Sequence, residues 1–493
     1  MLDCIILALD APFYRDENNY QRKKHLAYRP LGPYKISWIA RKHGYRALTI
    51  SRLQLLSEQE IIELIEPLIN SKTVIGVSTA FIQPPLQMLI DKNYEDKLST
   101  RELFKLRTVV EALRAKHNNK VVVGGSVGQI FHDFFRADQS FSGEAENAIV
   151  KYLDQHFRSG IQKKPYDWNI QSCDFRWHES DCVQTNEVLP LEMSRGCMFK
   201  CKFCAWEMIG KKRGTYERNI SALRDELIYN YEHFNTTSYI LASDTINEDN
   251  QRMNEWCDML ESLPFRIRYT GFARLDLAYT NPHITRRLYE TGLSGVHFGV
   301  ETFNYDAAKS IGKGFSAKHG KQALEYIFYD LFQKNVAINV TMIVGLPGEN
   351  SDSIYSSVNW FQSHPKIHVG FFPLQLANPA LVPEHYTLSE FSKNILDYGY
   401  SFSDHAVNWK NDIMEWKDAV NICYDIMNYK IQTNTLESWS SIMYLNKSQK
   451  PPNYFITGNT NQLISKLAPE IEQDNQNYFL TLKKYIEKFP FFD

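Results

Sequence analysis

The stretch Cys197-Met-Phe-Lys-Cys201-Lys-Phe-Cys204 places three cysteines at a C-x3-C-x2-C spacing, directly after a mainly apolar run that ends in Gly196. Three thiolates so close in sequence can face one centre only if the backbone wraps around it. Iron–sulfur clusters take cysteine thiolates as ligands. No fourth cysteine lies at a matching distance, so the spacing predicts a cluster with one open iron, where a small molecule can bind and react. Free buried thiols on a loop are the alternative.

The composition is that of an ordinary globular protein. The 493 residues are enough for two or three domains, with 43% hydrophobic and 23% charged residues. A formal net charge of −2 gives no general attraction to nucleic acid. No long apolar run and no charged-then-apolar leader is present, which predicts a chain without a membrane span. The other cysteines are dispersed, and this usage predicts a reduced, cytoplasmic protein; they are Cys4, Cys173, Cys182, Cys257 and Cys423.

The first 160 residues alternate between short apolar runs and amphipathic segments. We expect strands at 2–9, 47–50, 74–78 and 121–126, and helices at 36–43, 58–69 and 103–117. This order predicts a Rossmann-like, doubly wound parallel sheet that binds ligands at the carboxyl ends of its strands. Ser78 and the pair Gly124-Gly125 lie at such ends. The glycines let a ligand approach the backbone, although a plain turn explains them equally well.

From residue 189 the alternation resumes with longer units. Strands are expected near 189, at 238–242, 267–272, 295–300, 337–344 and 368–374, with helices at 220–233, 251–260, 282–291 and 318–334. About six units of this kind predict a partial (β/α)6 barrel of the TIM type, whose chemistry lies at the carboxyl ends of the strands. Four polar residues stand at those ends: Asp244, Arg274, Asp276 and Glu301. Carboxylates suit amino groups or ribose hydroxyls and an arginine suits a carboxylate, while ion pairs between strands are the alternative for each residue alone.

With Phe203 just before its last cysteine, the loop at 197–204 resembles the cluster loop of the radical S-adenosylmethionine (SAM) superfamily, and the resemblance extends over residues 189–380. It implies a [4Fe-4S] cluster on Cys197, Cys201 and Cys204, with SAM bound at the open iron and cleaved to a 5′-deoxyadenosyl radical. It also implies roles in binding SAM for six residues. Phe203 would pack on the adenine, Asp244 would contact the methionine amine, Arg274, Asp276 and Glu301 would line the cofactor, and Gly345, in the run 343–349, would lie near the adenine.

The upstream region resembles the cobalamin-binding-type domain that precedes many such barrels. The resemblance is carried by residues 31–32, 74–78, 122–125 and 143–146, and it implies cobalamin near Ser78, Gly124 and Gly125. The family motif that supplies an axial histidine is absent, because Arg41-Lys-His43-Gly44 has no aspartate two residues before the histidine. Bound cobalamin and a domain kept only for its structure both stay open.

These observations predict four regions. They are a cobalamin-binding-like domain at 1–160, a linker at 161–188, the radical SAM partial barrel at 189–380, and a mainly helical region at 381–493 that caps the barrel or shapes the substrate site. The last region has helix-like stretches at 388–398 and 412–430, the tryptophans Trp409, Trp416 and Trp439, and a break at Pro451-Pro452.

The leading hypothesis for function is cobalamin-dependent methyl transfer to an unactivated carbon or phosphorus. A rearrangement, cyclisation or oxidation without cobalamin, and an iron–sulfur redox-sensing adaptor, are the alternatives. Only Cys4 precedes residue 173, which argues against the second cysteine trio of methylthiotransferases, and only Cys423 follows Cys257, which argues against an auxiliary cluster. Expected partners are a small-molecule or peptide substrate and an electron donor such as flavodoxin or ferredoxin. The basic residues around the loop are read as a solvated face.

Overall fold

The structure is a computed structural model, and it describes residues 1–12, 26–80, 98–125, 128–141, 143–158, 168–206, 208–313, 315, 317–382, 386–402, 408–426 and 460–488. The chain forms two compact units. The N-terminal unit contains Met1–Pro190, Asp225–Thr236 and Ala468–Asp493, and the barrel unit contains Leu191–Arg224 and Thr237–Leu467. The predicted features Trp439 and Pro451-Pro452 lie outside the described residues.

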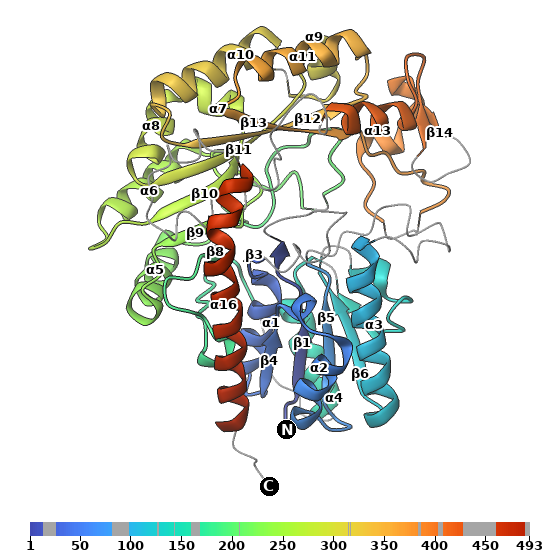
Figure 1. Cartoon of the computed structure of the whole chain (residues 1–493), viewed down its shortest axis with the longest axis vertical. Coiled ribbons are helices and arrows are strands. Elements are labelled where there is room, and N and C mark those ends of the chain that lie inside the picture. Colours follow the sequence, from blue (N-terminus) through green and yellow to red (C-terminus); the bar gives the residue numbers. More distant parts are fainter. Residues whose placement is uncertain are drawn as a thin grey trace. The chain divides into compact units, whose positions relative to one another are not determined.

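The N-terminal unit is built on a five-stranded sheet in the order β4-β1-β5-β6-β7 (Figure 1). All four pairings are parallel. The strands are β1 (Cys4–Leu7), β4 (Ala47–Ile50), β5 (Val74–Ser78), β6 (Lys120–Gly124) and β7 (Gln139–Phe141). The order reverses between β1 and β5, as it does in doubly wound sheets of the flavodoxin type. The prediction of a doubly wound parallel sheet is therefore confirmed.

Four helices accompany this sheet: α1 (Leu31–Lys42), α2 (Glu58–Ile65), α3 (Leu98–His117) and α4 (Ala145–Phe157). Helix α2 begins at a capping box in which Ser57 and Glu60 satisfy each other's backbone N–H groups. It ends earlier than the sequence predicts, since Pro67 lies in the 3-10 turn Glu66–Leu68 that follows. The fully buried strands β1, β4 and β5 read as continuous apolar runs because parallel sheets are covered on both faces.

The N-terminal unit also includes segments from far along the chain. In helix α16 (Thr460–Lys488), Tyr478 and Leu482 join the apolar core of this unit. The described part of the predicted linker, 168–188, supplies Glu187, which pairs with the buried Arg29 at 2.8 Å and with Arg52 at 2.9 Å. The four-region division of the chain remains a prediction, because these units group residues by packing and not by role.

The barrel unit is built on a six-stranded sheet in the order β13-β12-β11-β10-β9-β8. Its strands are β8 (Leu189–Leu191), β9 (Ser238–Leu241), β10 (Arg268–Ala273), β11 (Leu293–Glu301), β12 (Ala337–Val344) and β13 (Ile367–Pro373). The pairs from β9 to β13 are parallel. Each strand neighbours the next one in sequence, which is the arrangement of a partial barrel, and this confirms the predicted fold.

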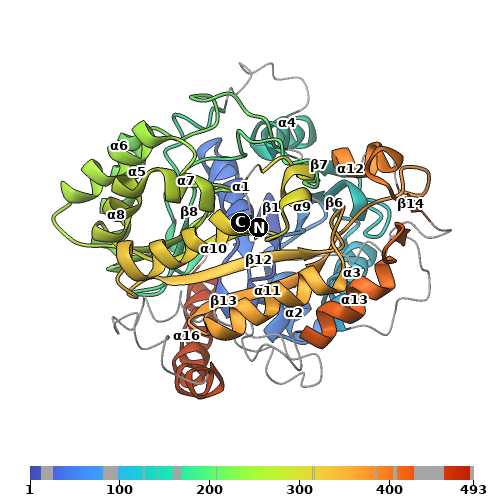
Figure 2. The ribbon, with the colours of Figure 1, turned by 90° about the horizontal axis from the view of Figure 1, so that it is seen from above.

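The helices of this region follow the strands. They are α5 (Ile220–Phe234), α6 (Asn250–Glu261), α7 (Leu275–Thr280), α8 (Pro282–Glu290), α9 (Tyr305–Ser310), α10 (Ala317–Tyr326), α11 (Ser351–Ser363), α12 (Glu390–Lys393) and α13 (Trp416–Asp425). Figures 1 and 2 show α10 and α11 beside β12 and β13. The predicted helix 318–334 is α10 followed by a π-helical turn, Ile327–Leu331. Among the described residues, no helix is long and apolar enough to cross a membrane.

Candidate active site

The cysteine loop follows β8 at the carboxyl end of the barrel sheet and folds back on itself. The amide of Cys197 donates to Met208 O at 2.9 Å, and the amide of Lys211 donates to Cys197 O at 3.1 Å. Gly196 has φ +110°, and a Cβ there would lie 2.6 Å from Met208 O. Only glycine fits this position, because other residues avoid positive φ and would clash. The backbone wrapping expected from the spacing is thus present.

Hydrogen-bonding groups surround the three cysteines, which are half-buried. Thr245 Oγ1 lies 3.6 Å from Cys197 Sγ, and Arg274 Nη1 lies 3.7 Å from Cys201 Sγ. Burial raises the pKa of Cys197 to about 11 and raises the pKa of Cys204. A thiol of this kind ionises when a metal coordinates it. The donors around the sulfurs are those that stabilise a metal–thiolate site.

The described residues of the loop are not gathered around a site for a single metal ion. Over the described ranges, no three His, Cys, Asp or Glu side chains are gathered so that they could hold one metal ion together. A [4Fe-4S] cluster makes a different demand, since each cysteine ligates its own iron and the sulfurs stay apart. Three cysteines with hydrogen-bond donors beside them therefore fit a cluster, and the assignment of Cys197, Cys201 and Cys204 as its ligands remains a prediction.

Asp244, predicted to bind SAM, stands just beyond β9 and touches the cysteine loop. Its Oδ2 accepts a hydrogen bond of 3.0 Å from the amide of Gly196. Burial raises the pKa of the Asp244 carboxyl group, although the Gly196 amide acts in the opposite direction. The carboxylate thus holds the first residue of the loop in place, a use that the sequence did not predict.

Arg274 and Asp276, at the end of β10, form one unit. The guanidinium donates to both carboxylate oxygens, at 3.0 Å and 2.6 Å. Arg274 Cζ also lies 4.1 Å from the ring centroid of Phe199, in the cysteine loop. The Asn247 side chain holds the Arg274 backbone with two hydrogen bonds. Its Oδ1 accepts from the Arg274 amide at 2.8 Å, and its Nδ2 donates to Arg274 O at 2.9 Å. Asn247 was missed by sequence reasoning, although it lies three residues after Asp244.

Glu301 ends β11 in a strained conformation, with φ +71° at a break in the register with β12. Its carboxylate accepts from Lys313 Nζ at 2.7 Å, and the same ammonium donates to Gly299 O at 2.6 Å. Lys313 Nζ lies 5.8 Å from the ring of Phe203, the residue expected to pack on the adenine. A non-glycine residue at positive φ is uncommon and tends to occur where function demands it. Lys313 had no signal in the sequence.

Gly345, at the end of β12, lies in a tightly packed turn. Its φ is +98°, and an added Cβ would lie within 3.0 Å of two ring carbons of Trp409. Tyr400 donates to Gly345 O at 2.6 Å. The carboxylate of Glu349 accepts from the amides of Gly345 and Leu346, at 3.2 Å and 3.1 Å. The structure therefore gives this glycine a packing role, and its predicted role beside the adenine is untested.

The predicted cobalamin-binding residues lie at the carboxyl edge of the N-terminal sheet. Ser78 ends β5, next to the switch point of the strand order, and its Oγ accepts from the amide of Ala80 at 3.3 Å. Gly124 ends the neighbouring β6 and accepts from the amide of Thr79 at 2.9 Å. A Cβ on Gly125 would lie 2.5 Å from Thr79 Oγ1. The three residues are together, and packing alone accounts for Gly125.

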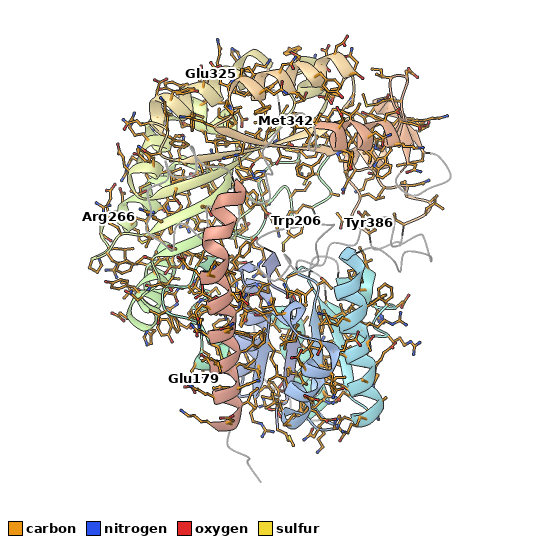
Figure 3. All side chains as sticks on the ribbon, in the orientation of Figure 1. Glu179, Trp206, Arg266, Glu325, Met342 and Tyr386 are labelled. Carbon is orange, nitrogen blue, oxygen red and sulfur yellow. The ribbon has the colours of Figure 1, made fainter. Side chains whose placement is uncertain are left out.

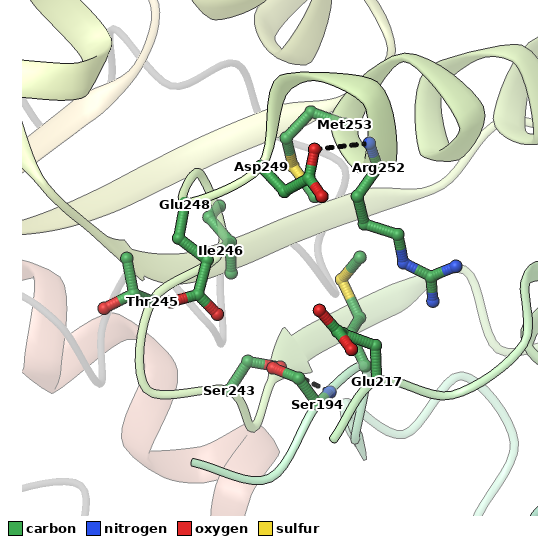
Figure 4. A pocket seen from close by; sticks show the side chains of 10 residues that line it. Ser194, Glu217, Ser243, Thr245, Ile246, Glu248, Asp249, Arg252 and Met253 are labelled. Carbon is green, nitrogen blue, oxygen red and sulfur yellow. Dashed lines mark hydrogen bonds between the residues drawn. The ribbon is translucent and has the colours of Figure 1, made fainter. Parts of the chain in front are cut away.

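A small cavity of about 20 Å³ lies behind the cysteine loop (Figure 4). Ser194, Thr245, Glu248 and Arg252 are among the residues that line it. This volume suits about one water molecule. Glu248 was missed by sequence reasoning and holds the loop from this side. It accepts from the amide of Met198 at 3.1 Å and from the hydroxyl of Tyr216 at 2.7 Å.

Part of the C-terminal region, around α12, contacts the same loop within the barrel unit. The amide of Phe391, in α12, donates to Lys202 O at 3.1 Å. Lys202 Nζ lies 5.3 Å from the ring of Tyr398. The Trp409 indole donates to Leu374 O at 2.7 Å, just beyond β13. Residues 389–402 and 408–409 thus pack on the carboxyl ends of the barrel strands, and the cap remains a prediction.

Comparisons with known proteins agree with this geometry. Residues 191–361 match the model of the radical SAM superfamily. An uncharacterized methyltransferase of Pyrococcus horikoshii, PH0819, is 24% identical over 191 residues, which are 38% of each chain. The match thus covers well under half the length of this curated relative.

Two solved structures are similar to this chain in fold. The radical SAM methyltransferase TsrM of Kitasatospora setae, solved with tryptophan substrate and a SAM analogue, has a TM-score of 0.57 at 13% identity. The match covers 82% of this chain and 79% of that one. The cobalamin-dependent radical SAM enzyme OxsB, solved with aqua-cobalamin and SAM, has a TM-score of 0.51 at 16% identity, covering 80% of this chain and 56% of that one. At these identities the matches show the fold alone.

Proposed function

The chain carries a radical SAM domain preceded by a domain with the fold of cobalamin-binding modules, and on this premise we propose that it is a cobalamin-dependent radical SAM methyltransferase. Cys197, Cys201 and Cys204 would hold a [4Fe-4S] cluster, with SAM at its open iron. Together these groups supply the one-electron reductive cleavage of a carbon–sulfur bond. An unactivated carbon or phosphorus would receive the methyl group.

The observation that carries the proposal is the convergence of strand-end groups on the cysteine loop. Asp244 binds the amide of Gly196, and Arg274 points Nη1 at Cys201 Sγ. Because Asp276 occupies the other side of the Arg274 guanidinium, the side toward the loop stays directed at the site. A guanidinium so placed suits the carboxylate of an amino acid. The Asp244 carboxylate would accept a hydrogen bond from the amino group of SAM.

Lys313 and Glu301 would together line the SAM site farther along the carboxyl edge of the barrel sheet. Their pairing at 2.7 Å keeps the local charge balanced and fixes the Lys313 side chain beside Phe203. Phe203 would pack against the adenine, and the turn at Gly345, fixed by Glu349, would bound that part of the site. These residues would bind and orient SAM and would keep water out of the site. A reactive radical requires such exclusion of water.

Cobalamin would bind in the N-terminal unit. The carboxyl edge beside the β1/β5 switch is where doubly wound sheets bind cofactors, and Ser78, Gly124 and Gly125 lie on or next to it. TsrM and OxsB were both solved with cobalamin bound. The second candidate is a radical SAM rearrangement, cyclisation or oxidation without cobalamin. It is favoured by the missing histidine motif at 41–44 and by Thr79, which fills the space beside Gly125.

The two candidates separate in one experiment. The full chain is purified anaerobically with hydroxocobalamin supplied, reduced, and given SAM. Corrinoid that stays with the protein through gel filtration, together with S-adenosylhomocysteine formed alongside 5′-deoxyadenosine, supports methyl transfer. Formation of 5′-deoxyadenosine by a chain that retains no corrinoid supports the second candidate. If SAM is not cleaved at all, both candidates are wrong.

A further inference from the structure

The two faces of the barrel sheet differ in what covers them. On one face, Phe371 of β13 packs against Phe361 of α11, with ring centroids 6.2 Å apart, and Tyr269 of β10 packs against Trp256 of α6 at 5.7 Å. Met342, labelled in Figure 3, pairs with Phe371 and points to the same face. The opposite face, turned away from these helices, is called here the inner face.

A row of opposing residues crosses the inner face. Phe272 pairs with His297, His297 with Asn339, and Asn339 with His368. Opposing residues in a sheet point to the same side, and so do residues two apart on one strand. Thr270, Thr341 and Phe372 therefore share this face with the row. The inner face is polar in its middle and carries an aromatic side chain on each side.

Three buried polar atoms of the inner face have no hydrogen-bond partner among the described residues. They are Thr270 Oγ1, Asn339 Oδ1 and His368 Nδ1. Their residues are only 0%, 2% and 9% exposed. Folded proteins rarely leave such atoms unpaired, so each one points to a water molecule or a ligand that completes it. Their occurrence on one face of one sheet marks that face as a place where something polar binds.

The hydrogen bonds within the row determine which donor and acceptor atoms remain for a ligand. Asn339 Nδ2 and His297 Nδ1 lie 3.0 Å apart, and His297 Nε2 bonds Thr341 Oγ1. The amide N–H donates to Nδ1, so the imidazole proton sits on Nε2 and is donated to the Thr341 oxygen. Thr341 then has its own hydrogen to donate. The inner face offers a donor at Thr341 and an acceptor at Asn339 Oδ1.

The two aromatic side chains are exposed, which is unusual inside a barrel. Phe272 is 38% exposed and Phe372 is 42% exposed. The Phe272 ring lies 5.0 Å from the imidazole of His297, tilted by 47°. Exposed aromatic rings beside unpaired polar atoms are the composition of a ligand site, with apolar walls and a few polar groups that orient the ligand.

The row itself is uncharged near neutral pH. Burial lowers the pKa of His297 to about 4, with a further contribution from the Lys313 ammonium, and burial lowers the pKa of His368 to about 4. Lys313, whose charge acts on His297, is paired with Glu301 at 2.7 Å. A charged ligand group placed on the row would lose its hydration without gaining an opposite charge.

We propose that the inner-face row is the part of the substrate site that holds an uncharged planar group, which donates an N–H or O–H to Asn339 Oδ1 and accepts from the Thr341 hydroxyl. That the bound molecule is the substrate rests on the proposed function. The binding site itself rests on the exposed rings and the unpaired polar atoms of the inner face. The substrate class is thus a planar amide or nitrogen heterocycle, with any charged part held elsewhere.

The test uses the full chain without SAM or reductant, so its result does not depend on the radical chemistry. Benzimidazole, which is planar and carries both a donor and an acceptor, is titrated by calorimetry. Indene, a hydrocarbon of similar shape, is titrated in parallel. The variant Thr341→Val removes the donor and also the oxygen that accepts from His297 Nε2. Thr285→Val is its control, since Thr285 is a buried threonine of α8 whose hydroxyl donates to Ala278 O at 2.8 Å.

Benzimidazole is expected to bind the wild type and Thr285→Val equally, and Thr341→Val about tenfold more weakly, the effect of losing one buried hydrogen bond. Indene should bind weakly and be unaffected by Thr341→Val. Phe272→Leu, which keeps every polar group, should weaken both probes, and this holds the test open if Thr341→Val fails to fold. The proposal is overturned if benzimidazole does not bind, if indene binds as tightly, or if the folded Thr341→Val protein matches its control.

Discussion

Replacing Gly345 by alanine tests whether the turn after β12 is fixed by the contacts described. Two costs add. A non-glycine residue at φ +98° is unfavourable by about 1–2 kcal/mol. The new Cβ would lie within 3.0 Å of two Trp409 ring carbons, well inside normal contact distance, and such overpacking costs about 1–3 kcal/mol. We expect Gly345→Ala to lower the free energy of unfolding of the barrel unit by about 2–5 kcal/mol.

The matched control is Gly399→Ala. Gly399 has φ +79°, and nothing lies within 4 Å of a Cβ added there. This variant has the conformational cost without the clash, so the difference between the two variants measures the Trp409 contact. Unfolding in urea, followed by tryptophan fluorescence and by hydrogen exchange of β12, gives both values. Trp409→Phe should recover part of the Gly345→Ala loss. Equal destabilisation by the two glycine variants would show that the Trp409 contact is not there.

Two further predictions concern buried charges. Burial raises the pKa of Glu349 to about 7, so the folded chain binds more protons than the unfolded chain above about pH 4.5. Stability should therefore fall by up to about 3 kcal/mol as the pH rises through 7. Glu349→Gln should flatten this part of the profile in denaturant titrations, and an unchanged slope would refute the assignment. Glu187→Gln removes the carboxylate that pairs with both Arg29 and Arg52. The N-terminal unit should lose about 3–5 kcal/mol, measured by hydrogen exchange of β1 and β4, and a loss below 1 kcal/mol would contradict the network.

The sheets could be predicted from the sequence because their strands are buried apolar runs. The runs at 47–50, 74–78 and 337–344 have the same bounds in the sequence and in the structure. The predicted ends of the strands that carry Asp244, Arg274 and Glu301 lie within one residue of the observed ends, so these residues could be placed at the carboxyl edge of the sheet. Short helices such as α7 and α9 were missed, since six residues are too few to show a helical period.

The parts that escaped prediction depend on contacts between distant residues. Lys313 reaches Glu301 from a loop, and no local pattern marks it. The positive φ of Glu301 could not be predicted from the sequence, because a glutamate adopts positive φ only when its surroundings require it. Helix α16 joins the N-terminal core through Tyr478, whose hydroxyl accepts from the amide of Ser51 at 3.1 Å. That contact spans most of the chain.

We propose that the cysteine loop holds a reactive iron–sulfur cluster. Anaerobic reconstitution of Cys201→Ala, followed by visible absorbance and by 5′-deoxyadenosine formation with SAM and dithionite, tests it most directly. Cys257→Ala is the control, since Cys257 is a buried cysteine of α6 in the same unit. We expect the control to keep cluster absorbance and SAM cleavage, and Cys201→Ala to lose both. Retention of the cluster and of 5′-deoxyadenosine formation by Cys201→Ala would contradict the account.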